Sequence, residues 1–551
     1  MVQKSFLFIT ERILNTYDKI HTMKFVKYGN SKRKLIAFII IIGFFFSSYF
    51  AGASYIINDI ISETTEGEID DSNFIDPDLQ LMKNMSNQFG FYLERDNIPL
   101  NYTLTAIWKD TNFTEIEYYR TAGDAAIWTG MMLGSESFHY AIAKRSGNET
   151  ARLDALRMVK KILTGVKYLL AVPNGGIGPE YDATLARSVW SPDYSGPRIY
   201  EVGPEEAKEQ PQDVFNGTDP YSNWYWKRYP STDQNCGIIF GITRCAILVA
   251  PDDPWVANLT SLMAQQYVEY YLRTNWLLTD GNIEGGRRTT GQEFKISVEN
   301  SGYWALSILK MAQLANPGNP RYNQLYYHYA YERRYAQHLK PRVNLGLFHF
   351  TNYFTLNLQW VILFNLAESE RDPYLKRLYQ ETVEKYFYSV TKTSRNAWFN
   401  IAYLGMMNKN DTFVARDIAD QIMRFSIARF PNNITRVPDR GGAMNPYPPE
   451  QIGRAKMEYW RNFLENNPLG KIFYGWWLLP LLFTDDPDRL LNSPKTVDQY
   501  HAEDFLFQRN PWVTSNNSTE YLEFTARRQD SGLAFLLPYY MSIYYNIWEG
   551  L

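Results

Sequence analysis

The chain has 551 residues, a formal net charge of -3 and two cysteines, Cys236 and Cys245. This charge provides no basic surface for nucleic acid, so a nucleic-acid partner is not expected. Two cysteines exclude both a disulfide scaffold and a cysteine-rich zinc cage. If both lie on one helix, their spacing of nine residues separates them by about 13.5 Å along the axis, which is too far for a disulfide.

An uncharged apolar stretch, Leu35–Ile57, is the first predicted element. It is long enough to cross a hydrocarbon core of about 30 Å as a helix. It is also too long, and begins too far from Met1, for a cleaved signal peptide. Basic residues precede it and acidic residues follow it, so the positive-inside rule predicts a cytoplasmic N-terminus and an external C-terminal part. We therefore expect a cytoplasmic tail (1–34), an uncleaved single-pass anchor in the cell membrane (35–57), an acidic linker (58–75) and an extracellular domain (76–551).

Asparagine sequons agree with this topology, because none of them precedes the predicted anchor. Each N-x-S/T triplet is a weak signal alone, but their density beyond the anchor favours a glycosylated surface. They begin at Asn84, Asn101, Asn112, Asn148, Asn216, Asn258, Asn410, Asn433, Asn516 and Asn517.

Beyond residue 76 the dominant pattern is helical. Apolar residues recur at helical spacing from Leu153 to Leu170 and from Val414 to Phe425, which predicts two amphipathic helices. Further helices are expected at about 77–95, 124–145, 235–249, 256–277, 299–315, 321–338, 355–369, 373–390, 396–408, 452–465, 470–483 and 533–548.

The connections between these helices are of two kinds. Short ones carry Pro, Gly, Asp or Asn, residues typical of turns and helix N-caps, as in APDDP (250–254), NPGNPR (316–321), SERDP (369–373) and NKND (408–411). Long ones span 173–232, 279–298, 341–355, 431–451 and 487–520. Because short and long connections roughly alternate, we expect helical hairpins whose long loops gather at one end, where a functional site is usually found.

This organisation resembles the (α/α)6 toroid of the six-hairpin glycosidase superfamily, which includes glycoside hydrolases, polysaccharide lyases and sugar epimerases. The resemblance covers about residues 76–551. It is carried by the segments GDAAIWTG (123–130), TDQNCGIIFG (232–241), RNAWFN (395–400) and FLLPYYMSIYY (535–545). It implies an all-α ring of helical hairpins with a sugar-binding cleft at the ends of its inner helices.

Two carboxylates occupy similar positions at the starts of predicted helices. Asp124 precedes AAIWTGMML and is predicted either to cap that helix or to face the cleft. Asp233 follows Ser231 and Thr232, either of which can be the cap, and would enter the first turn if Thr232 caps. Since glycoside hydrolysis uses one carboxylic acid and one base or nucleophile, we predict Asp124 and Asp233 as the catalytic pair.

The long connection 173–232 contains the most polar and aromatic residues. Flat aromatic rings cover the apolar faces of sugars, and polar groups beside them fix the orientation of the ligand. The alternative is that these rings pack the loop against the helices. The predicted substrate-binding residues of this segment are Glu180, Asp182, Trp190, Trp224 and Trp226.

Other candidate substrate-binding residues lie further along the chain. Glu284 stands beside Arg287 and Arg288, and these cations would suit an acidic sugar. Asp439 stands beside another arginine, and a salt-bridged surface loop is the alternative in both cases. Asn396 and Trp398 would line the cavity if their helix is an inner one, although Trp398 also suits a core position.

No zinc-protease, EF-hand or P-loop motif is present, so no metal or cofactor is expected, although scattered carboxylates could still hold Ca²⁺. The predicted function is a membrane-anchored cell-surface protein that acts on a glycan as a glycoside hydrolase. One alternative is a polysaccharide lyase or sugar epimerase, with Arg287 or Arg288 neutralising a uronic carboxylate and a tyrosine or His349 as the base. Another alternative is a non-catalytic module that binds a glycan or a protein.

Overall fold

The computed structural model describes residues 69, 71–120, 122–279, 283–284, 287–288, 291–293, 302–339, 353–425, 494–500, 505–511 and 526–550. They all belong to one compact unit, Ile57–Leu551. No helix among them is long and apolar enough to cross a membrane. The predicted anchor, Leu35–Ile57, lies outside the described residues, so it stays a prediction.

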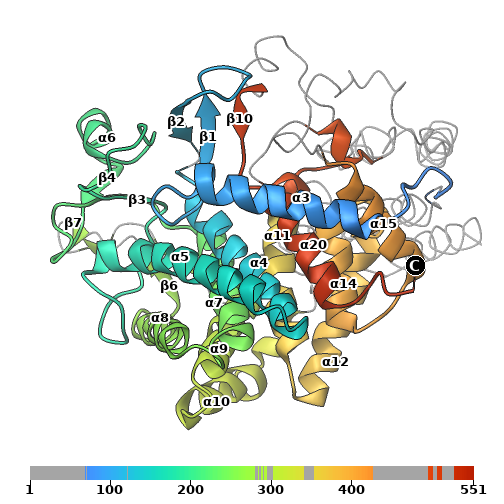
Figure 1. Ribbon diagram of the computed structural model, residues 1–551. Helices are drawn as coiled ribbons and strands as arrows, with labels where there is room; N and C mark the ends of the chain where they lie inside the picture. Colours follow the sequence, from blue (N-terminus) through green and yellow to red (C-terminus); the bar gives the residue numbers. More distant parts are fainter. Residues whose placement is uncertain are drawn as a thin grey trace, which may run out of the picture. The chain divides into compact units, whose positions relative to one another are not determined.

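The described part of the chain is mostly helical, which confirms the all-α class (Figure 1). Its α-helices are α3 (Leu79–Tyr92), α4 (Ala125–Arg145), α5 (Glu149–Asn174), α6 (Pro204–Glu209), α7 (Thr232–Leu248), α8 (Pro254–Arg273), α9 (Tyr303–Ala315), α10 (Pro320–Tyr327), α11 (Tyr353–Ser369), α12 (Pro373–Thr382), α13 (Ser389–Thr391), α14 (Ala397–Met407), α15 (Thr412–Met423) and α20 (Leu533–Tyr544). Shorter 3-10 and π segments are η1 (Leu93–Asn97), η2 (His328–Glu332), η3 (Tyr335–Leu339), η4 (Val383–Tyr388), η6 (Val497–Gln499) and η7 (Leu506–Gln508).

Most predicted helices are confirmed to within a few residues. Two of them are divided: the predicted helix 321–338 becomes α10, η2 and η3, and the predicted helix 373–390 becomes α12, η4 and α13. The predicted helices 452–465 and 470–483 lie outside the described residues.

Six of the described helices are buried along most of their length: α4, α7, α9, α11, α14 and α20. Each packs against the next one along the chain, and α20 packs back against α4. Six others, each buried mainly along one face, pack on these: α5 on α4, α8 on α7, α10 on α9, α12 on α11, α15 on α14 and α3 on α20. Buried and partly exposed helices therefore alternate along the sequence.

Amphipathic patterning explains the partly exposed helices. On α5, Val159, Leu163, Val166 and Leu170 are buried as predicted, whereas Leu153 at its start is exposed. On α15 the predicted apolar face from Val414 to Phe425 is buried. Both cysteines lie on α7, buried and unbridged, as their spacing predicted.

The short connections contain the predicted N-caps. The side chain of Asp253 accepts hydrogen bonds from the first amides of α8, and Asp372 does the same for α12. Asn319 and Asp411 cap α10 and α15 in the same way. Each cap satisfies amides that have no partner within the helix, which fixes where the second helix of a hairpin begins.

Glycines allow α4 and α7 to pack with their backbones in contact. A Cβ atom on Gly130 would overlap the backbone of Gly237, and one on Gly241 would overlap the carbonyl of Gly130. A Cβ on Gly237 would in turn overlap the carbonyl of Ile127. We call these residues, Gly130, Gly237 and Gly241, the glycine seam.

Short strands form small sheets at the connections. The strands are β1 (Thr105–Trp108), β2 (Ile116–Arg120), β3 (Val189–Trp190), β4 (Val214–Asn216), β5 (Tyr225–Lys227), β6 (Leu277–Thr279), β7 (Ile283–Glu284), β8 (Arg287–Arg288), β9 (Gly291–Glu293) and β10 (Arg528–Gln529). Two sheets have three antiparallel strands, ordered β10-β1-β2 and β3-β5-β4, while β6 pairs with β9 and β7 with β8. The strand β10 pairs with β1, although more than 400 residues separate the two along the chain (Figure 1).

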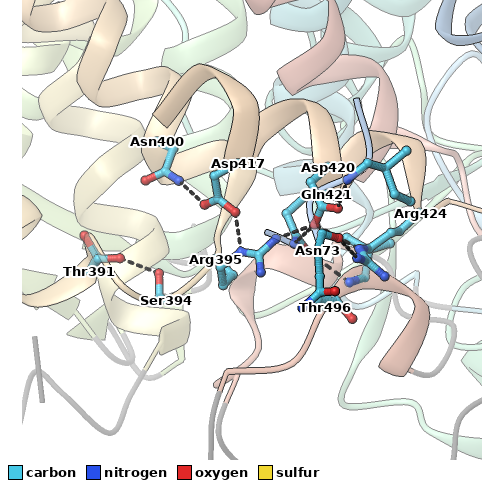
Figure 2. Close-up of polar contacts among 12 residues, drawn as sticks. Asn73, Thr391, Ser394, Arg395, Asn400, Asp417, Asp420, Gln421, Arg424 and Thr496 are labelled. Atoms are coloured by element: carbon cyan, nitrogen blue, oxygen red, sulfur yellow. Dashed lines mark hydrogen bonds and ion pairs between the residues drawn. The ribbon is translucent and has the colours of Figure 1, made fainter. Parts of the chain in front are cut away.

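A charged cluster is buried between α14 and α15 (Figure 2). The guanidinium of Arg395 donates hydrogen bonds to both Asp417 and Asp420, and Arg424 donates to Asp420 at 2.9 Å. Arg395 also has a φ of 54°, a left-handed conformation that is uncommon for a residue with a side chain. Burial raises the pKa of Asp417, although Arg395 opposes this shift.

The same cluster holds the first described residues of the chain. Asp420 accepts a hydrogen bond from the backbone amide of Ile75 at 2.8 Å. The ring of Phe74 lies 4.4 Å from the Arg395 guanidinium, and Asp71 forms an ion pair with Arg416 at 2.6 Å. Residues 71–75, the last part of the predicted acidic linker, are therefore packed on the helical body.

The glycine seam yields a stability prediction. Gly130→Ala should lower the free energy of unfolding by about 3 kcal/mol, because the added methyl group meets backbone that has no space to move into. The control is Gly90→Ala in α3, where a Cβ meets nothing within 4 Å. Alanine there should raise the free energy of unfolding by up to about 1 kcal/mol. Chemical denaturation measures the free energy of unfolding of both variants. An equal effect of the two substitutions would contradict the close backbone contact at the glycine seam.

The charged cluster yields a prediction with a pH signature. Arg395→Ala leaves two buried carboxylates without this guanidinium and should cost about 3–5 kcal/mol of stability near pH 7. Without Arg395 the pKa of Asp417 rises further, because the guanidinium no longer opposes the effect of burial. The lost stability should then be smallest at about pH 4, where Asp417 can be protonated, and grow as pH rises.

Urea denaturation at several pH values, with wild type and Arg395→Ala side by side, measures this difference. A deficit that stays constant between pH 4 and pH 7 would show that the carboxylates do not depend on Arg395.

Candidate functional site

The glycine seam holds the first turns of α4 and α7 next to each other. Asp124 occupies the N-cap position of α4, but its side chain makes no capping hydrogen bond. The N-cap of α7 is Ser231, so Asp233 lies in the first turn of that helix. Of the alternatives predicted for Asp124, capping of α4 by its side chain is therefore wrong. Of the two predicted caps of α7, Ser231 is the one observed.

Arg187, from the long connection between α5 and α7, joins these two helix starts. Its guanidinium donates to the carbonyl oxygens of Gly123 and Tyr229, both at 2.6 Å. It also donates to Ser231 Oγ at 3.2 Å and to Asp124 Oδ1 at 3.4 Å. One planar side chain with five donors thus contacts both helix starts, which a lysine could not do.

A second bridge runs through Gln234. Its amide nitrogen donates to Asp124 Oδ1 at 3.0 Å, and its amide oxygen accepts from the backbone of Ile127 at 3.1 Å. The hydroxyl of Ser231 donates to the carboxylate of Asp233. Asp124 and Asp233 therefore belong to one hydrogen-bonded group that also contains Arg187, Ser231 and Gln234.

A cavity of about 240 Å³ opens beside Asp124. Two arginines and two carboxylates contribute to its wall, and the lining residues are Thr105, Ile107, Arg120, Gly123, Asp124, Glu201 and Arg528. Asp233 is not among them. The sequence pattern marked only Asp124 here, because the other residues come from strands and a loop whose pairing is not visible in the sequence.

A larger cavity of about 530 Å³ is formed mainly by the connection between α5 and α7. Three of the predicted substrate-binding residues, Glu180, Asp182 and Trp226, line it. The remaining lining residues are Pro173, Asn174, Tyr181, Thr184, Phe215, Asn216, Thr218 and Arg228. This volume is in the range of sites that hold small organic ligands.

The sheet β3-β5-β4 positions the aromatic wall of this larger cavity. Phe215 on β4 is the register partner of Trp226 on β5, so their side chains lie on the same face of the sheet. The indole nitrogen of Trp226 donates to the carbonyl of Asn216 at 3.1 Å, which fixes the ring. The guanidinium of Arg228 lies 5.2 Å from the Phe215 ring.

Polar groups complete the wall. Thr184 is 2% exposed, and its hydroxyl has no hydrogen-bond partner among the residues that the structure describes. Asp182 is held by Arg273 at 3.3 Å, whereas Glu180, an exposed residue, makes no hydrogen bond or ion pair within the described part of the chain. A buried polar group without a partner is uncommon in a folded protein and is one mark of a place where a ligand or water binds.

The other predicted residues lie elsewhere. Trp190 packs on Tyr225 and Trp224 packs on Tyr168, and neither lines one of the two cavities. Asn396 caps α14 and donates to the carbonyl of Phe507. Trp398 is fully buried against Phe240 and Phe364.

The remaining candidates have little or no structural description. Glu284, Arg287 and Arg288 belong to the hairpin of β7 and β8, but their side chains lie outside the described part of the structure. Asp439 and His349 lie outside it entirely. The roles predicted for these residues therefore stay predictions.

Comparison with known proteins adds no identity, because no family model, no curated protein and no solved structure matches the chain. The two cavities and the hydrogen-bonded group around Arg187 are therefore the features of the described structure that bear on function.

Substitution of Arg187 tests the hydrogen-bonded group at the starts of α4 and α7. Arg187→Gln should lower the free energy of unfolding by about 2 kcal/mol, because several hydrogen bonds to a charged donor are lost at a partly buried position. The matched control is Arg157→Gln. Arg157 forms an exposed ion pair with Glu94, and such pairs contribute about 1 kcal/mol or less. Thermal and urea denaturation compare the two, and equal effects would contradict the joining role of Arg187.

Proposed function

We propose that this protein acts on carbohydrate, as a glycoside hydrolase that uses paired carboxylates. The observation that carries the proposal is the larger cavity, which Trp226, Phe215 and Tyr181 line together with Glu180 and Asp182. Aromatic rings beside carboxylates match the two surfaces of a sugar, since its C–H face is apolar and its hydroxyls donate hydrogen bonds.

The packing of the helices supports an (α/α)6 toroid as the architecture. Buried helices alternate along the chain with partly exposed ones, and the contacts among the buried set run from α4 through to α20 and back to α4. The short connections follow the buried helices, and most of the long ones precede them. Loops on such a ring would gather near the starts of the inner helices, where Asp124 and Asp233 are found.

Asp124 and Asp233 are our candidates for the catalytic pair. In such a pair one carboxylic acid protonates the leaving oxygen, and the other carboxylate activates water or attacks the sugar. The hydrogen bonds from Arg187 and Gln234 orient the carboxylate of Asp124, and Ser231 orients that of Asp233. Two oriented carboxylates at adjacent helix starts support this assignment, because the chemistry needs one carboxyl group on each side of the glycosidic bond.

The predicted extracellular location would place this activity at the cell surface. With Leu35–Ile57 as a membrane anchor, the helical unit would stand outside the cell and meet surface glycans. No cofactor is needed for hydrolysis by two carboxylates.

Turnover of a glycan panel by the full-length protein tests the proposal. Wild type should release new reducing ends from at least one glycan. Asp124→Asn and Asp233→Asn should each reduce that rate by about 10²–10⁴-fold, the usual contribution of an acid or base. Asp154→Asn, an exposed position on α5, is the control and should leave the rate unchanged.

Glycan affinity, measured apart from turnover, tests the role of the larger cavity. Trp226→Ala should weaken glycan binding about tenfold, which corresponds to about 1.4 kcal/mol. The matched control, Trp255→Ala, removes an exposed ring from α8 and should not affect binding. Binding with no turnover in wild type would replace the hydrolase with a glycan-binding module, and unsaturated products would replace it with a lyase.

A further inference from the structure

A glycine-rich turn after α5 shapes one part of the larger cavity. Gly175 is the left-handed residue that ends this helix, with a φ of 82°. A Cβ atom on Gly176 would overlap the ring of Tyr181, and one on Gly178 would lie 2.7 Å from the carboxylate of Glu180. Glycine leaves room for these two side chains, so the turn fixes where the ring and the carboxylate line the cavity.

Oxygen atoms that can accept hydrogen bonds line this cavity. The amide nitrogen of Asn174, the last residue of α5, donates to the carbonyl oxygens of Leu170 at 2.7 Å and Thr184 at 2.8 Å. Both of its N–H groups are then used, and its Oδ1 is left as an oriented acceptor. Within the described part of the chain, neither this oxygen nor the carboxylate of Glu180 receives a hydrogen bond.

The buried hydroxyl of Thr184 is a second, independent mark of a ligand. Asp182 and Thr184 line the cavity, whereas Ala183 and Leu185 belong to the hydrophobic core. This alternation is that of an extended segment, in which side chains two residues apart share one side, so the Thr184 side chain belongs to the cavity wall. Its hydroxyl has no partner among the described residues, which costs free energy until a ligand or a water molecule binds to it.

Among the described residues that line this cavity, Arg228 is the one cation. It is 7% exposed, and its guanidinium lies 5.2 Å from the rings of both Phe215 and Tyr229. Arg228 is therefore packed between aromatic rings, whereas Glu180 is exposed. A ligand that enters from solvent meets the Glu180 carboxylate, which repels an anion and accepts hydrogen bonds from hydroxyl groups.

We propose that the larger cavity binds a neutral sugar residue through Asn174, Glu180 and Thr184, which makes a neutral glycan the substrate class. This inference rests on the proposed action on carbohydrate. Each hydroxyl group of a sugar donates one hydrogen bond, which matches a wall rich in acceptors. The carboxylate of a uronic acid only accepts, so the same wall disfavours it. The inference therefore favours hydrolysis over the lyase alternative, which needs a uronic carboxylate.

Ligand-observed NMR titration of the full-length protein tests the inference with matched pairs of sugars. The pairs are methyl glucoside with methyl glucuronide and methyl galactoside with methyl galacturonide, which differ only at C6. Wild type should bind the neutral member of at least one pair at least tenfold more tightly than its acidic partner. Glu180→Gln should reduce that preference to about threefold or less, because the carboxylate that repels the acidic sugar is gone.

Glu149→Gln is the matched control for the loss of charge. Glu149 is the first residue of α5 and Asn174 is the last, so about 37 Å of helix separates this substitution from the cavity. The preference for the neutral sugar should be the same in this variant as in wild type.

Thr184→Val separates recognition from folding. Valine keeps the shape of the side chain and removes a hydroxyl that has no partner in the free protein. The neutral sugar should then bind about fivefold more weakly, while the free energy of unfolding does not fall. The control is Thr243→Val on α7, where the buried hydroxyl donates to the carbonyl of Ile239 at 2.6 Å. That variant should be less stable and bind the sugar as wild type does.

Three outcomes would overturn the inference: tighter binding of an acidic sugar than of its neutral partner, an equal effect of Glu180→Gln and Glu149→Gln, or unchanged affinity for the neutral sugar in Thr184→Val. An acidic sugar that binds in a Trp226-dependent manner would overturn only the substrate class and leave the action on carbohydrate. No binding of any sugar, together with no turnover of any glycan, would overturn the proposed function as well.

Discussion

Contact between the backbones of α4 and α7 is the constraint on which the rest of the described site depends. Glycine at 130, 237 and 241 lets the two helices approach more closely than any side chain would allow. Their first turns are then near enough for one arginine and one glutamine to contact both. If the helices moved apart by the width of a methyl group, these bridges would stretch beyond hydrogen-bonding distance.

The long connection between α5 and α7 contributes to both parts of the site. Its sheet presents Trp226 and Phe215 to the larger cavity, and its Arg187 reaches the two helix starts. Lys227, at the end of β5, pairs with Glu201 on the wall of the smaller cavity. A long connection with this many hydrogen bonds to the body is a structured part of the site.

Several features of the site were predictable from local sequence. Asp124 and Asp233 stand out because each precedes or enters a helix next to small residues, and Glu180, Asp182 and Trp226 stand out in an aromatic segment. Trp190 and Trp224 have the same local signature, yet they pack on other rings outside the two cavities. Which tryptophan lines a cavity depends on strand register, and a shift of one residue reverses the face of every side chain.

The sequence by itself determined most of the described helices, several of their caps and the alternation of short and long connections. These follow from apolar spacing and from amides that need a partner within a few residues, which are local requirements. Only the tertiary structure decided that Arg120 and Arg528, far apart in the chain, line one cavity, and that Arg395 is buried between Asp417 and Asp420. Such contacts depend on long-range strand register and helix packing, which leave no periodic signal in the sequence.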